Sequence, residues 1–196
     1  MKFIFFLSFL FAGFCVSAQE ETGTSKVIRL KGNFNCLYKN KFSAEKRKKN
    51  YPFNIADTVK IVSFRYHFNN YPIDSNSFIT DSLIDIRTLN ESEVDVMTDI
   101  IYNNFYKRKP NYLEVAGCFW PRHAILFIDD KGKLLESVLI CFSCDRYILS
   151  SKNIDFGDRC LQKMSKLKSF FKLKGIKFGL DKEHGLYPGE TSDYLY

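Results

Sequence analysis

A predicted β-hairpin at residues 122–142 constrains the fold more than any other segment of this chain. Two apolar runs, residues 122–129 and 133–142, flank Asp130-Lys131-Gly132, which places a glycine at the left-handed position of a three-residue turn. Folding the strands back about this turn brings Cys141 and Cys144 near Cys118, with His123 close by on the first strand. The sequence therefore predicts that cysteines gather at the open end of the hairpin.

The first 18 residues have the pattern of a secretory signal peptide. The apolar stretch Phe3–Val16 is shorter than the roughly 20 residues that a membrane-spanning helix needs, and Val16-Ser17-Ala18 has small residues where a signal peptidase reads. We expect export to the periplasm or the extracellular space, with the mature chain beginning at Gln19. Lipidation of Cys15 is disfavoured because the bulky Phe14 precedes it. No later transmembrane segment is predicted.

The composition favours a folded chain, since 45% of the residues are apolar and 16% are aromatic. Residues 19–54 are polar and basic, and we expect a leader that is partly disordered. Residues 55–196 have a length that suits one domain.

The order of predicted elements indicates an α+β fold. Strands are expected at residues 58–68 and 82–89, and a helix follows from Asn90, where Glu93 completes a capping box, to about Lys107. After the hairpin, a second helix is expected from about Asp158 to Gly175. The order β-β-α-β-β-α predicts an antiparallel sheet with two helices on one face.

Five cysteines remain after signal removal, and in an oxidising compartment disulfides are their default state. Cys160 is expected on the apolar stripe of the second helix, facing the sheet. Two disulfides are therefore predicted among Cys118, Cys141, Cys144 and Cys160, with three pairings open. Cys36 has polar surroundings and is predicted to be the unpaired, accessible thiol.

Two other uses of these cysteines remain open. Tetrahedral zinc prefers four soft ligands. These could come from the Cys141-x-x-Cys144 motif, Cys160 and either Cys118 or His123. The same Cys-x-x-Cys motif follows a strand, as in thiol–disulfide oxidoreductases. However, the residues after Cys144 predict no helix whose N-terminus could activate the thiol.

No catalytic residue or cofactor is predicted from the rest of the chain. The only histidines are His67, His123 and His184, and we interpret His67 as structural and His184 as exposed. Phosphate-binding loops, serine elbows and paired-histidine metal helices are absent from the sequence. A net charge of +7 permits attraction to anionic surfaces, but no nucleic-acid-binding motif accompanies it.

About the last 80 residues resemble a group of small exported bacterial proteins of unknown function, chiefly from Bacteroidota. The similar motifs are Cys118-Phe119-Trp120-Pro121-Arg122-His123, Ile140-Cys141-Phe142-Ser143-Cys144, Phe156-Gly157-Asp158-Arg159-Cys160, Phe170-Phe171 and Gly175-Ile176. The resemblance implies that Cys118, Cys141, Cys144 and Cys160 belong together, and it implies no known activity.

The sequence thus favours an exported, soluble binding or interaction module of unknown ligand, whose partner is a protein or an anionic surface. The alternative is an enzyme that uses the cysteine cluster, either a thiol–disulfide oxidoreductase or a zinc-dependent protein.

Overall fold

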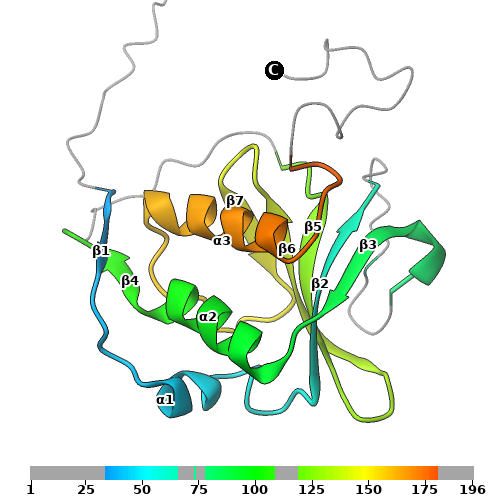
Figure 1. Cartoon of the computed structure of the whole chain (residues 1–196), viewed down its shortest axis with the longest axis horizontal. Coiled ribbons are helices and arrows are strands. Elements are labelled where there is room, and N and C mark those ends of the chain that lie inside the picture. The colour runs from blue at the N-terminus through cyan, green and yellow to red at the C-terminus, as the bar shows by residue number, and fades with distance from the viewer. Residues whose placement is uncertain (1–33, 66–72, 74–77, 109–118, 181–196) are drawn as a thin grey trace, which may run out of the picture. The chain divides into compact units, whose positions relative to one another are not determined.

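A five-stranded antiparallel sheet carries two helices of similar length on one of its faces (Figure 1). The computed structural model describes residues 34–65, 73, 78–108 and 119–180, all of which lie in one compact unit. The strands follow the order β3-β2-β5-β6-β7 across the sheet. Their bounds are β2 Thr58–Phe64, β3 Leu83–Thr88, β5 His123–Ile128, β6 Leu134–Cys141 and β7 Arg146–Leu149. The predicted α+β class is confirmed.

The predicted hairpin is formed by β5 and β6. Its turn places Gly132 at φ 81°, and Asp129 Oδ1 accepts hydrogen bonds from the backbone N–H groups of Lys131 and Lys133 at 3.0 and 2.7 Å. Every residue of β5 is buried, because both faces of the sheet are covered. The hairpin is therefore the centre of the fold rather than an exposed ribbon.

The larger core lies between the sheet and the two helices, α2 Glu91–Tyr102 and α3 Leu161–Leu173. Asn90 and Glu93 form the predicted capping box, with each side chain accepting from the other residue's backbone N–H at 2.9 Å. The core contains buried side chains from the sheet and from both helices, among them Ile61, Ile125, Phe127, Val138, Ile140, Met97, Ile101, Met164, Leu167, Phe170 and Phe171.

A second apolar cluster covers the opposite face of the sheet. Its buried side chains come from β2, β5 and β6, and Ile73 lies over them. A short 3-10 helix, η1 Thr80–Ser82, directly precedes β3. Edge strand β3 is the least buried in its sheet, and Ile84 and Ile86 are exposed.

The first predicted helix is shorter than expected. It ends at Tyr102, and Asn104–Tyr106 forms strand β4, which pairs with β1 Cys36–Tyr38. The Asn103 side chain explains the change of structure, because its amide donates to the Phe42 carbonyl at 3.1 Å and accepts from the Phe42 N–H at 3.0 Å. A contact with a segment 61 residues away therefore overrides the helical spacing that predicted a helix to Lys107.

Residues 34–54, assigned from sequence to a polar leader, belong to the folded unit. This stretch contains β1 and a short helix, α1 Ala44–Lys48. Arg47 is 4% exposed and donates hydrogen bonds to Asp95 and Thr98 of α2. The Phe53 ring meets the Phe127 ring edge to face at 4.9 Å between centroids. The core thus begins before residue 55.

Candidate functional site

Two of the four clustered cysteines meet at the turn between β6 and β7. Cys141 is the last residue of β6, residues 142–145 form the turn, and Asp145 adopts φ 49° to start β7. The sulfurs of Cys141 and Cys144 lie 2.9 Å apart, and Ser143 Oγ is 3.2 Å from the Cys141 sulfur.

The two sulfurs differ in state. Cys141 is a free thiol and is 1% exposed. Cys144 is half-buried and is disulfide-bonded. Cys118 lies outside the described residues, so its predicted place in the cluster stays a prediction.

Cys160 is bonded to a cysteine outside the predicted cluster. It forms a disulfide with Cys36, so the prediction that Cys36 is the unpaired thiol is wrong. The β1–β4 ladder brings the N-terminal segment beside the start of α3, where the Leu161 N–H donates to the Phe34 carbonyl at 2.9 Å. Cys160 is the N-cap of α3 rather than part of its apolar stripe. A three-residue strand such as β1 has too little alternation to reveal this pairing in the sequence.

This disulfide removes the basis of the zinc hypothesis. Zinc binds thiolates, and neither the Cys160 sulfur nor the Cys144 sulfur is a thiolate while it is held in a disulfide. Within residues 34–65, 73, 78–108 and 119–180, no group of three or more metal-ligating side chains could hold a metal ion.

His123, proposed as an accessory residue, is buried in an aromatic environment. Its ring lies 5.0 Å from the Phe142 ring and 6.0 Å from the Phe171 ring, and its Nε2 donates to the Phe178 carbonyl at 2.8 Å. Burial lowers the pKa of His123 to about 4, so the ring is neutral at pH 7. Nδ1 has no hydrogen-bond partner among the described residues. Of the other histidines, His67 and His184 lie outside them.

Next to His123, sequence reasoning missed a polar cluster that spans three neighbouring strands. Ser63 pairs with His123 on one side and with Asp85 on the other. Asp85 Oδ2 accepts from Ser63 Oγ at 2.7 Å and from the backbone N–H groups of Lys177 and Phe178, both at 2.9 Å. Serine, histidine and aspartate also make up the catalytic triad of many hydrolases. Here, however, Ser63 is fully buried and its hydroxyl donates to Asp85. The cluster therefore anchors the segment after α3 to the sheet.

Two further buried ionisable side chains, those of Lys163 and Glu136, form hydrogen bonds within the fold. Lys163 Nζ donates to the Phe156 carbonyl at 2.9 Å, and burial lowers the pKa of Lys163 to about 7. Glu136 accepts hydrogen bonds from Tyr51, Ser150 and Ser151. Burial opposes ionisation of Glu136, but these hydroxyl donors outweigh it and lower its pKa.

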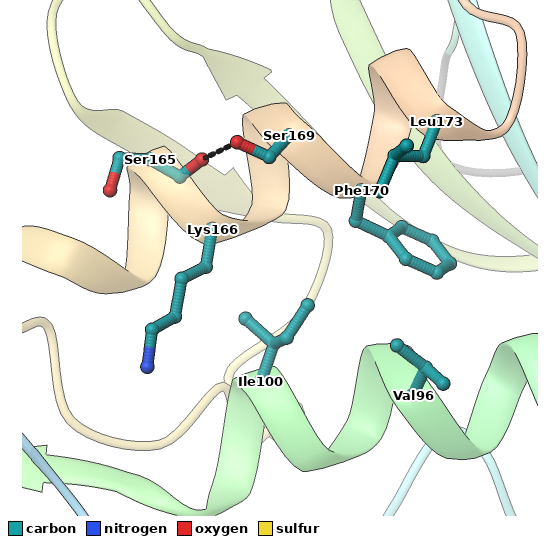
Figure 2. Close-up of a pocket in the computed structure, with 7 residues that line it drawn as sticks. All are labelled: Val96, Ile100, Ser165, Lys166, Ser169, Phe170 and Leu173. Carbon is teal, nitrogen blue, oxygen red and sulfur yellow. Dashed lines mark hydrogen bonds between the residues drawn. The ribbon is translucent and has the colours of Figure 1, made fainter.

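An apolar groove lies between α2 and α3. Figure 2 shows Val96 and Ile100 rising from α2 and Lys166 and Phe170 reaching from α3 towards them. The groove has a volume of about 270 Å³, and Ser165, Ser169 and Leu173 complete its lining. Val96 is 50% exposed and Leu173 is 82% exposed, so the rim presents apolar surface to solvent.

Comparisons with models of protein families, with curated proteins and with solved structures found no match for this chain. Among the described residues, no helix combines the length and apolar character needed to cross a bilayer.

Proposed function

We propose that the chain is an exported interaction module, stabilised by disulfides, whose contact surface is the groove between α2 and α3. The exposed apolar rim of this groove is the observation that carries the proposal, since Leu173 is the most exposed of the large apolar side chains described. Exposed apolar surface beside a groove marks an interaction site in folded proteins. The Cys36–Cys160 disulfide supports the proposed export, because disulfides persist in oxidising compartments.

The buried ionisable groups favour binding over catalysis. Among the described residues, Arg47, Glu136 and Lys163 each have hydrogen-bond partners within the fold. Cys141 is 1% exposed, which leaves its thiol out of reach of an external substrate. None of these groups lines the groove between α2 and α3.

The shape of the groove suits the side chains of a protein partner. Its volume of about 270 Å³ lies below the roughly 300–1,000 Å³ of pockets that enclose drug-sized ligands. We take the partner to be a second copy of the chain, because the apolar groove and the exposed apolar side chain of Leu173 lie on the same face. A twofold axis along the groove would bring Leu173 of one copy against the groove of the other.

Sedimentation velocity over a range of protein concentrations tests this contact. We expect the parent protein to dimerise as its concentration rises, and Leu173→Glu and Val96→Glu to remain monomeric. Ile148→Glu is the matched control, because Ile148 is 45% exposed on β7, outside the groove. A monomeric parent at every concentration, or a Leu173→Glu variant that dimerises as well as the parent, overturns the proposed contact.

Export has its own test. N-terminal sequencing of protein recovered outside the cytoplasm should begin at Gln19, after Val16-Ser17-Ala18. Retention of Met1 would refute export, and a lipid-modified Cys15 would refute release from the membrane.

A further inference from the structure

We propose that a face formed by β1, β4 and α1 docks on an anionic phospholipid bilayer. In this cationic aromatic face, Lys41 and Lys46 lie against the rings of Phe42 and Phe105, and Leu37 lies on the same side of the β1–β4 ladder. The three elements lie at the end of the molecule away from β3 (Figure 1). None of these side chains lines the groove between α2 and α3, so the inference does not depend on the contact proposed between two copies.

The pairing of β1 with β4 builds the apolar base of this face. Leu37 lies directly opposite Phe105, and opposite residues of an antiparallel ladder project to the same side. The Phe42 ring packs on the Phe105 ring with 6.0 Å between centroids. Both rings are half-buried and Leu37 is 39% exposed, so the base presents apolar surface to solvent.

Two ammonium groups lie against this base. The Lys41 Nζ is 5.1 Å from the centroid of the Phe42 ring and 5.5 Å from that of Phe105. The Lys46 Nζ is 4.8 Å from the centroid of the Phe42 ring. An aromatic ring attracts a cation to its face, so these contacts hold both charges beside one pair of rings.

The charge of this face is not neutralised by the folded chain around it. Residues 39–49 include six basic side chains and one acidic side chain. Arg47 and Lys48 are ion-paired with acidic residues of α2. Lys41 and Lys46 are exposed, and in the part of the chain that the structure describes no salt bridge involves either of them. An anion from outside the chain would offset the repulsion between these two like charges.

The combination of charge with apolar surface favours a bilayer as the partner. Anionic headgroups attract lysines near the membrane surface, and apolar and aromatic side chains beside them enter the boundary between headgroups and acyl chains. A soluble polyanion offers the negative charges without an apolar phase. The exposed Leu37 side chain and the two rings would then gain nothing from binding.

Flotation with vesicles tests the role of the lysines. The protein should bind vesicles of phosphatidylcholine with phosphatidylglycerol more tightly than vesicles of phosphatidylcholine alone. A lysine near an anionic surface contributes about fivefold in affinity, so Lys41→Gln/Lys46→Gln should bind the anionic vesicles about 25-fold more weakly. Lys131→Gln/Lys133→Gln is the charge-matched control, because it removes two exposed lysines from the β5–β6 turn. This control should bind like the parent.

A second pair of variants tests the apolar base. Leu37→Ser should weaken binding to the anionic vesicles with all the lysines in place, whereas Ile148→Ser, at a residue 45% exposed on β7, should not. Equal affinity of the parent for neutral and anionic vesicles would overturn the proposal. Equal losses in the two lysine pairs would do so as well, because net charge alone would then explain binding. Unchanged binding by Leu37→Ser would reduce the contact to the electrostatics of any polyanion and would also overturn it.

Discussion

The Cys36–Cys160 disulfide should contribute a large share of the protein's stability. The bond joins residues 124 positions apart, so it closes a loop of most of the folded chain. In the chain-entropy description, a loop of about 125 residues restricts the unfolded state by about 5 kcal/mol at 25 °C. Native-state strain and residual structure in the unfolded chain commonly reduce the measured value, so we expect a loss of about 2–5 kcal/mol on removal. Typical domains have a total of about 5–15 kcal/mol.

The test is urea denaturation of a Cys36→Ser/Cys160→Ser variant against the parent under non-reducing conditions. The variant should unfold at a clearly lower urea concentration, since β1 and the start of α3 lose their covalent link. Cys141→Ala is the matched control, because it removes a cysteine and leaves this disulfide in place.

An unchanged unfolding midpoint, with hydrogen-exchange protection lost in β1 and β4 only, would refute the reasoning. That result would mean that the bond holds a segment that opens locally, and that the long loop does not restrict global unfolding.

Three further perturbations test the interior of the fold. Gly157→Ala should destabilise more than Gly132→Ala in thermal melts: both glycines have positive φ, but a Cβ at Gly157 would lie 2.6 Å from the Ile101 carbonyl oxygen, whereas Gly132 has open space. Because the pKa of His123 is lowered to about 4, the unfolded chain binds its proton first, and stability should fall by about 3 kcal/mol between pH 6.5 and 4. His123→Phe should flatten this part of the pH–stability curve. Glu136→Gln should cost about 1–3 kcal/mol near pH 7 in urea titrations, because the amide cannot accept all three hydroxyl donors. The loss should shrink as the pH falls through the lowered pKa of Glu136.

The elements that could be predicted from the sequence are those coded by residues close together in the chain. The β5–β6 hairpin follows from two apolar runs around Gly132, and the start of α2 follows from Asn90 and Glu93. Local turn chemistry and capping act within a few residues, so their effect survives in almost any tertiary context.

The candidate groove could not be read from the sequence. Val96 and Leu173 lie on two helices that meet only because both pack on the same face of the sheet. A single helix with some exposed apolar residues gives no sign of a second helix beside it, since exposed apolar side chains are common on protein surfaces.

The sequence by itself determined the hairpin, the helix cap, the apolar faces and the α+β class of this protein. Only the tertiary structure decided that α2 ends at Tyr102, that residues 34–54 join the fold, and that Cys36 is bonded to Cys160. Each of these outcomes depends on contacts between residues far apart in the chain, such as Asn103 with Phe42. Such contacts stabilise the fold only after the sheet and helices have brought the two partners together, so no local sequence pattern could encode them.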